Sequence, residues 1–347
     1  RPLRLPDYQN EYSQGTLGKY DVDFLNGWGA PIQGQQVINF RNEPETLTAN
    51  PDNVSNFYNT GVILRNNISF SSSSETTDFR AIVSQFNQDG TAPNSALDRT
   101  NISFNAGTDL GNGVTARASV NYVKSSDQGR VLAGGNDPNV LVSTLVDIPR
   151  NISNAQLENY LTPDGQDQFA LTANVNNPYW VANENVLQIG VERIFGSAQA
   201  SYAPLDWLEF SGRIGTDFYT ENRTQYVQQN TRGALLGSFF DDTIQQRQID
   251  TDFIVSAEGD LSSDFSLKGL LGHNYNQRTT ERLRNDAVQL NVRNVVSPGN
   301  ARNNIPGKGF SERKLVGAYG EATLGFRDYA FLTLTGRNDW TSTLPPE

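Results

Sequence analysis

The links between apolar segments alternate in length along this chain, and this alternation restricts the fold more than any single residue does. Five links are short, at 71–78, 110–113, 203–206, 260–264 and 326–329. The links between those hairpins are longer, at 87–99, 125–189, 221–248 and 277–311. Antiparallel hairpins with long loops on one side only are typical of transmembrane β-barrels. The sequence therefore predicts an all-β, antiparallel up-and-down β-barrel with short periplasmic turns and long extracellular loops.

Between these links, apolar and polar residues alternate with the period of two that a strand between two environments requires. The clearest segment has apolar Val114, Ala116, Ala118, Val120 and Tyr122 at every second position. The pattern predicts ten strands, each near the roughly 9–11 residues that a tilted strand needs to cross an apolar layer. The expected polar face carries Arg65, Arg80, Arg117, Glu209, Arg213, Glu258, Lys268, Glu321 and Arg337. Because a charge that faces lipid is costly, we expect these residues to face a polar lumen and to form ion pairs.

The composition is compatible with a water-filled barrel and excludes several other classes. Mean hydropathy is -0.53, yet aromatic residues reach 10%, so the chain is too rich in aromatic residues to be disordered. No apolar run approaches the roughly 18 residues that a transmembrane helix needs. The formal net charge of -11 argues against a nucleic-acid partner. The absence of cysteine excludes disulfides and thiolate metal sites.

The ends of the chain suggest an internal piece of a longer protein. Residues 1–60 lack sustained periodicity and are expected to form one long extracellular loop region, with barrel strands and their links from 61 to 347. The chain contains no methionine and does not begin with an apolar leader. Because open sheet edges are excluded from lipid, we expect further strands both before and after this segment.

Four local motifs are similar to those of a known family. The segment LTGRNDWTSTLP at 334–345 follows a short turn and a strand rich in aromatic and aliphatic residues. The stretches RLPDYQNEYSQG at 4–15, NFYNTGVILRNNISFS at 56–71 and NNPYW at 176–180 precede it. In this order, the four motifs resemble those of SusC/RagA-type TonB-dependent transporters. The resemblance extends over essentially the whole chain.

The resemblance implies a multi-pass protein of the cell outer membrane, in contact with outer-membrane lipid. The complete barrel would have about 22 strands around an N-terminal plug, and this chain would supply about ten strands without the plug. The resemblance also implies active import of an oligosaccharide or peptide cargo. A SusD-like surface lipoprotein would be one partner, and TonB–ExbB–ExbD would act through a segment that this chain lacks.

The resemblance also draws attention to two groups of residues. The family signature near the end of the chain comprises Arg337, Asn338, Asp339 and Trp340, for which we expect a structural role at a strand end. Tyr179 and Trp180 lie in the longest loop and are candidates for contact with a ligand or a partner. The alternative is that they hold their own loop together, as aromatic residues in loops more often do.

Other polar residues give no sign of a catalytic, cofactor or metal site. Acidic residues in the expected loops include Asp164, Asp167 and the pair Asp241 and Asp242, whose spacing does not match a calcium-binding loop. We expect these four to be solvated charges. Glu209 and Asp217 could suggest a glycosidase, but both lie on one strand with Arg213, which favours ion pairing. His273 is the only histidine and is expected in a strand near an apolar face.

Two other functions fit parts of the pattern. A passive, porin-like barrel would share the hairpins but would have no plug. A soluble carbohydrate-binding β-protein would share the alternation but would not need detergent. Neither alternative accounts for the family motifs, so the sequence favours import and predicts no enzyme activity.

Overall fold

Ten long strands form one antiparallel sheet in the computed structural model, which describes residues 7–129, Leu145, 148–327 and 329–343. The strands are β5 (Val62–Ser73), β6 (Thr77–Asp89), β7 (Ala96–Gly111), β8 (Val114–Gln128), β9 (Leu187–Leu205), β10 (Leu208–Val227), β11 (Ser238–Asp260), β12 (Phe265–Leu290), β13 (Ala301–Phe326) and β14 (Ala330–Thr341). Strands that follow one another in sequence are neighbours in the sheet, and β5 and β14 form its edges. The predicted all-β fold with ten strands in five hairpins is confirmed.

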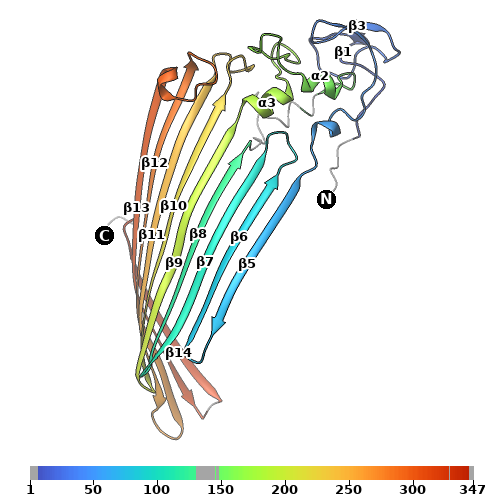
Figure 1. Cartoon of the computed structure of the whole chain (residues 1–347). Helices are drawn as coiled ribbons and strands as arrows, with labels where there is room; N and C mark the ends of the chain where they lie inside the picture. The colour runs from blue at the N-terminus through green and yellow to red at the C-terminus, as the bar shows by residue number, and fades with distance from the viewer. Residues whose placement is uncertain (1–6, 130–144, 146–147, 328, 344–347) are drawn as a thin grey trace.

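Short and long links lie at opposite ends of the sheet (Figure 1). The links at the lower end span 74–76, 112–113, 206–207, 261–264 and 327–329. Those at the upper end span 90–95, 129–186, 228–237 and 291–300. The links expected at 87–99, 221–248 and 277–311 are therefore much shorter than predicted. Parts of the expected loops, at 1–6, 130–144 and 146–147, lie outside the described residues.

The link between β7 and β8 shows how local sequence determines a hairpin. Asn112 and Gly113 form this link, with φ angles of 51° and 74°. Two successive residues in the left-handed region match the twist of antiparallel strands, and Asn-Gly is a favoured pair for such a turn. A Cβ atom at Gly113 would lie 2.2 Å from the carbonyl oxygen of Ala203 in the neighbouring hairpin. Glycine is therefore needed here for both conformation and space.

The strands are longer than the sequence predicts. The expected length was roughly 9–11 residues, but β5 and β14 have 12 residues and β12 and β13 have 26. The upper parts of the strands expose polar residues on both faces, so the apolar alternation ends while the backbone ladder continues. Hydrogen bonding between strands does not depend on side-chain polarity. The prediction recovered only the part of each strand that has one apolar face.

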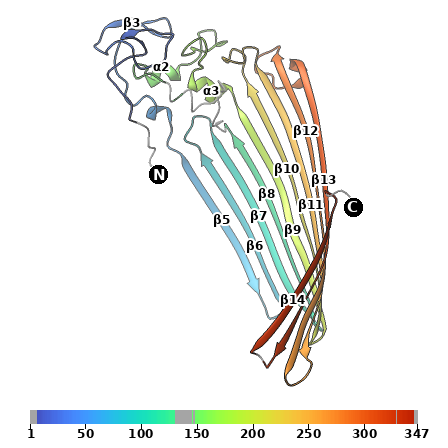
Figure 2. The same ribbon diagram turned by 180° about the vertical axis from the view of Figure 1, so that it is seen from behind.

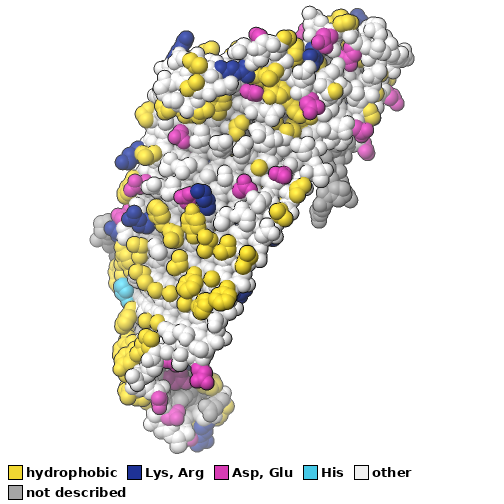
Figure 3. Space-filling model, in the orientation of Figure 1, with side chains coloured by type: hydrophobic (Ala, Val, Ile, Leu, Met, Phe, Trp, Pro, Cys, Tyr) yellow, Lys and Arg dark blue, Asp and Glu magenta, His cyan; other side chains and the backbone are white. Residues whose placement is uncertain are grey.

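The two faces of the sheet differ in polarity. On one face, Phe104 pairs with Val120 and Ala106 pairs with Ala118. Hydrophobic side chains gather across the middle of this face (Figure 3). The sheet curls so that β13 and β14 pass behind the other strands in Figure 1 and in front of them in Figure 2. The apolar face, which is turned toward the viewer in Figure 3, is therefore the convex side. We call the opposite, concave side the inner face.

The nine charged residues predicted to face a polar lumen all lie on the inner face. Because successive side chains of a strand point to opposite sides, the register fixes their direction. Glu258 pairs with Lys268, for example, and their Oε2 and Nζ atoms are 2.7 Å apart. His273 instead pairs with Phe253 and Ala318 on the apolar face, near which it was expected.

The upper links and the N-terminal region pack into a compact layer above the sheet, which we call the loop cap (residues 7–61, 148–186, 228–237 and 291–300; Figure 1). Its regular elements are β1 (Gly15–Thr16), β2 (Lys19–Tyr20), β3 (Gln36–Ile38), β4 (Pro44–Thr46), η1 (Ser55–Phe57), α2 (Asn154–Glu158), α3 (Pro178–Glu184) and η2 (Pro298–Asn300). A hydrophobic cluster that includes Phe57, Ile148, Leu157, Leu171 and Tyr179 joins the N-terminal region to the long link before β9. The region expected as one long loop therefore shares a hydrophobic core with the long link before β9.

Local sequence explains the two short helices of the cap. Ser153 and Gln156 form a reciprocal capping box at the start of α2. Asn177 caps α3 through its side chain, and Pro178 occupies the first turn, where no backbone donor is required. Within the described residues, no helix is long and apolar enough to cross a membrane.

Candidate functional site

A continuous row of register partners crosses the inner face from β6 to β14. In order, the row consists of Asp78, Gly107, Arg117, Gln199, Arg213, Asp252, Asn274, Gly317 and Asp339. Polar side chains occupy seven of these positions and glycines the other two. The inner face therefore presents a polar belt at one level of the sheet.

The two glycines of the belt make space for ion pairs. Arg117 Nη2 lies 3.4 Å from Asp78 Oδ1, two strands away across Gly107. A Cβ atom at Gly107 would lie 2.7 Å from that carboxylate oxygen and 3.0 Å from Arg117 Cζ. At Gly317, a Cβ atom would lie 2.6 Å from Arg337 Nη2, which pairs with Asp339 Oδ1 at 2.7 Å. Larger residues at either position would displace a charged pair.

The expected partners of Arg213 are wrong, although interior ion pairs are present. Arg213 binds Asp252 on β11 at 2.5 Å, and Asp252 also accepts a hydrogen bond of 2.7 Å from Asn274. Asp217 binds Arg193 on β9 instead. Residues four apart on a strand are separated by about 13 Å, whereas residues opposite each other on adjacent strands are about 5 Å apart. Residues two apart on one strand do pair in this sheet, as in Arg337–Asp339 and Arg284–Asp286. The carboxylates four residues from Arg213 are too far away, so its partner comes from the adjacent strand.

Higher on the inner face, one carboxylate is completely buried. The side chain of Asp242 is 0% exposed and accepts two hydrogen bonds of 2.7 Å from Arg282. Arg284 Nη1 lies 3.7 Å from the same group. The expectation that Asp241 and Asp242 form a pair of solvated loop charges is wrong for Asp242. The two residues are consecutive in β11, so their side chains point to opposite faces.

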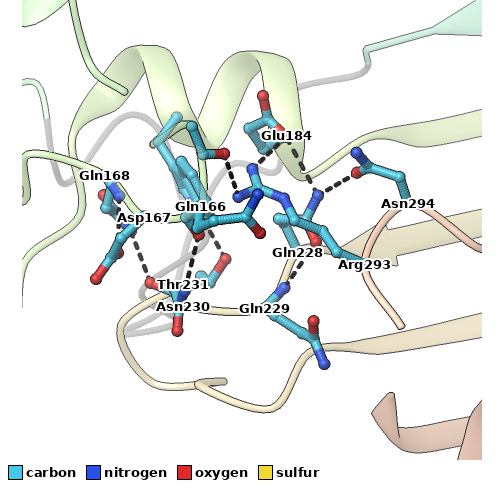
Figure 4. A network of polar contacts seen from close by, with 12 residues as sticks. Gln166, Asp167, Gln168, Glu184, Gln228, Gln229, Asn230, Thr231, Arg293 and Asn294 are labelled. Carbon is cyan, nitrogen blue, oxygen red and sulfur yellow. Dashed lines mark hydrogen bonds and ion pairs between the residues drawn. The ribbon is translucent and has the colours of Figure 1, made fainter. Parts of the chain in front are cut away.

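Three links of the loop cap meet in a network of polar contacts (Figure 4). Gln168 donates to the side chain of Asn176 at 2.7 Å and to the backbone oxygen of Asn230 at 3.0 Å. Asn230 donates in return to the backbone oxygen of Gln166 at 2.8 Å. These bonds join the long link before β9 to the link between β10 and β11.

Glu184, at the end of α3, joins the third link to the other two. Its Oε2 atom accepts from Gln228 at 3.3 Å and pairs with Arg293 at 3.4 Å. Arg293 also donates to the backbone oxygen of Gly165 at 2.6 Å. Tyr160 donates to the other Glu184 oxygen at 3.1 Å. Burial, followed by the charge of Glu184, raises the pKa of Tyr160 to about 12.

The structure places Tyr179 and Trp180 inside the cap. Trp180 is 0% exposed, donates through Nε1 to Thr231 Oγ1 at 2.8 Å and lies 5.2 Å beneath the guanidinium of Arg293. Tyr179 packs edge-on against Phe57 at 4.8 Å between ring centroids. Both residues are in the arrangement that the loop-holding alternative requires. Contact of either residue with a ligand or partner stays a prediction.

The remaining acidic candidates are held by ordinary loop contacts. Asp164 accepts hydrogen bonds from the Thr162 hydroxyl and the Gln166 backbone, which lower the pKa of its carboxyl group. Asp167 lies 3.6 Å from Arg232. Within the described ranges, no three histidine, aspartate or glutamate side chains come together as a metal site.

No pattern in the sequence indicates the polar network of the cap. Its polar residues lie in links without periodicity, and their partners lie up to 128 residues away in the chain. They include Gln168, Gln228, Asn230 and Arg293. Asn176 and Trp180 belong to a recognisable motif, NNPYW, and Glu184 follows it closely. Side-chain amides in loops are too common for their spacing to indicate a contact.

One hollow lies against the apolar face rather than within the cap. Its volume is about 970 Å³, and small side chains such as Ala106, Ala118 and Ala198 form its floor, with Phe104 and Ile214 beside them. In a barrel, this face meets lipid. The hollow is therefore unsuited to a water-soluble cargo.

The chain is similar in sequence and in fold to known proteins. No family model matches the chain. A curated relative, TonB-dependent receptor P3 from Formosa agariphila, is 23% identical over 311 residues, which cover 85% of this chain and 30% of the relative. Two structures of the RagAB peptide transporter superpose with TM-scores of 0.65 and 0.67, at 14% and 15% identity. They cover 82% and 84% of this chain, and the chain covers 32% and 33% of theirs. The chain has the fold of a SusC/RagA-type TonB-dependent transporter.

The four residues that resemble the SusC/RagA family signature lie in the edge strand β14. Arg337 and Asp339 point to the inner face, where the guanidinium stacks 5.3 Å from the ring of Tyr319. Asn338 and Trp340 point to the apolar face opposite Ala318 and Val316. A structural role for these four residues stays a prediction. The chain spans about a third of the length of these relatives.

Proposed function

We propose that this chain is part of an outer-membrane barrel that imports nutrients in a TonB-dependent manner. The observation that carries the proposal is the contrast between the faces of a sheet with the SusC/RagA fold. The convex face is an apolar surface suited to lipid, and the concave face is lined with ion pairs suited to water. A charged inner wall and an apolar outer wall are what a multi-pass protein of the outer membrane needs.

The proposed mechanism is conformational rather than chemical. The described inner-face carboxylates are held mostly by arginines, as in the Asp252–Arg213 and Asp242–Arg282 pairs, which suits a stable wall better than acid–base chemistry. A plug outside this chain would close the lumen, and force from TonB–ExbB–ExbD on that plug would open it. The protein would therefore be a transporter and not an enzyme.

The loop cap would receive cargo from a SusD-like surface lipoprotein. Its position at the end of the sheet with the long links places it on the extracellular side in the proposed orientation (Figure 1). The proposed cargo is an oligomer, either a peptide or an oligosaccharide. Tyr179 and Trp180 would contact cargo or partner only after the cap opened, because both are buried in the closed arrangement.

Uptake in living cells tests the proposal. The gene for the full-length protein would be deleted, and uptake of labelled peptides and oligosaccharides would be compared with that of cells that carry the gene, with and without TonB. We expect uptake that requires both the gene and TonB, and a lipoprotein that copurifies with the full-length protein in detergent. Uptake that requires the gene but persists without TonB would instead support a passive porin.

A further inference from the structure

The loop cap contains a second hollow, separate from the polar network, at the junction of the N-terminal region and the long link before β9. Its volume is about 450 Å³, within the range of sites for small ligands. Tyr8, Asn26 and Trp28 line one side, and Pro149 and Arg150 line the other. No residue that the family motifs single out for cargo or partner contact belongs to it.

Arg150 is the unusual member of this wall. Its side chain is 3% exposed, and its Nη2 atom donates to the backbone oxygen of Ile148 at 2.6 Å. Its Nη1 atom is buried without a hydrogen-bond partner. Within the part of the chain that the structure describes, no carboxylate pairs with Arg150, in contrast to Arg193, Arg213 and Arg282 on the inner face. Burial of a cation without a counter-charge is unfavourable, and here it lowers the pKa of the guanidinium.

Aromatic rings border the unpaired charge. The guanidinium of Arg150 stacks 4.2 Å from the ring of Tyr8. Trp28 is 71% exposed and lies 6.4 Å from the ring of Tyr12. A large aromatic side chain left open to water beside a hollow offers a flat surface for a sugar ring or an apolar side chain.

Hydrogen bonds to backbone atoms hold the two chain segments that form the walls of the hollow. On the Trp28 side, Gly15 donates to Asn26 at 2.9 Å and Gly18 donates to Trp28 at 3.1 Å. On the other side, Asn50 donates to Arg150 at 2.6 Å. Asn53 donates to the backbone oxygens of Pro149 and Ile152, both at 2.9 Å. The backbone that carries Trp28 and the backbone that carries Arg150 are thus each held in place beside the hollow.

We propose that this hollow binds a carboxylate-bearing unit of the cargo, with the carboxylate near Arg150 and the body of the unit against Trp28. The anion would supply the counter-charge that the protein does not provide, in the planar pairing that guanidinium and carboxylate groups favour. The inference rests on the proposed import function and narrows its cargo to acidic oligomers. A uronic-acid oligosaccharide and an acidic peptide share this chemistry.

Calorimetric titration of the purified full-length protein in detergent tests the inference. The probes are tetragalacturonate and tetraglutamate, with tetragalactose and tetraglutamine as uncharged counterparts. We expect one acidic probe to bind at least about tenfold more tightly than its uncharged counterpart, as loss of a charge-assisted contact implies. The preferred acidic probe identifies the source of the carboxylate. Equal affinity within both pairs of probes would overturn the proposal.

Two variants separate the roles of the walls. Arg150→Met keeps most of the side-chain volume and should remove the preference for the acidic probe while leaving affinity for the uncharged one unchanged. Trp28→Ala alters an exposed residue and should weaken both members of the preferred pair by a similar factor. Retention of the acidic preference in a folded Arg150→Met protein would contradict the proposal. If that variant does not fold, unchanged binding in Trp28→Ala would contradict it.

Failure of the inference can be distinguished from failure of the proposed function. TonB-dependent uptake without an acidic preference in titration would support import and overturn this site. An acidic preference that depends on Arg150, in a protein that supports no uptake, would support the site and overturn the proposed import.

Discussion

The lower half of the sheet and the loop cap use hydrophobic side chains in opposite ways. In the cap, Phe57 and Leu157 are at most 1% exposed and belong to one hydrophobic cluster, as in the core of a small soluble protein. In the sheet, Phe104 is 46% exposed and Leu271 is 71% exposed on the convex face. The cap carries its own apolar environment, whereas the sheet requires one from outside. One chain thus contains two regions that are stable in different solvents.

The largest loss of stability should follow from removal of a buried aromatic ring in the cap. Trp180→Ala removes a fully buried ring and its bond to Thr231, and such truncations cost about 3–5 kcal/mol. Hydrogen exchange of the amides in 228–237 should accelerate strongly, because this link loses its anchor. Trp28→Ala, at an exposed position in the same cap, should leave exchange nearly unchanged. Equal exchange in both variants would mean that the cap has no cooperative core.

Arginine substitutions on the two sides of β12 test which face of the sheet meets lipid. Leu271→Arg would place the charge on the convex face, where arginine near the middle of a bilayer costs about 2–4 kcal/mol. Leu270→Arg is the matched control, because its side chain faces inward opposite Glu321. Folding of the full-length protein into lipid vesicles, followed by denaturant titration, should show a large loss for Leu271→Arg only. Similar losses would contradict the assignment of the faces.

Ion pairs of the inner face should contribute to stability according to how deeply they are buried. Asp242→Asn weakens two charge-assisted hydrogen bonds at a completely buried carboxylate, with an expected loss of about 1.5–3 kcal/mol. Glu258→Gln affects the pair with Lys268, in which both side chains are about two-thirds exposed. Water and salt screen that pair, so the second variant should not differ measurably from the wild type in the same titration. An equal loss would show that burial does not control these pairs.

The smallest effect should be a pH dependence limited to the cap. The pKa of Tyr160 is raised from 10.0 to about 12, mainly by burial, so the folded cap holds this proton more tightly than the unfolded chain does. The stabilisation is complete below pH 10 and declines as the pH rises from 10 towards 12. Hydrogen exchange near Glu184 should accelerate over this range, and the acceleration should be smaller in Tyr160→Phe. An identical pH profile in the variant would exclude Tyr160 as the cause.

The sequence predicted the part of the sheet in which its two faces meet different environments. Ala116, Ala118 and Val120 alternate with polar residues because one face is apolar, and this contrast creates the signal. Above that level both faces meet water, and residues such as Asn222 and Thr224 carry no periodic pattern. Strand lengths were therefore underestimated, although the number, order and pairing of the strands were correct.

Contacts between distant parts of the chain could not be predicted from the sequence. The partner of Arg213 depends on which strands are adjacent and in which register, so local spacing suggested the wrong carboxylates. The cap core joins Phe57 to Tyr179, and Gln14 bonds to Asn151. Such pairs follow from the way the loops fold over the sheet, which a composition rich in glycine and asparagine does not reveal. The burial of Trp180 could not be predicted for the same reason.

The length of β12 has an electrostatic consequence. On the apolar face of β12, Tyr275 is the last residue of the apolar alternation, and Gln277 and Thr279 follow it. The strand continues from Asn276 to Leu290, a distance of about 50 Å at the usual rise per residue. With the tilt of a barrel strand, the cap would stand roughly 35–40 Å above the apolar layer in the proposed orientation. The Debye length in physiological salt is about 8 Å. Charged lipid headgroups would therefore exert almost no potential at Arg150, so its local field would be set by the cap and its ligand rather than by the composition of the membrane.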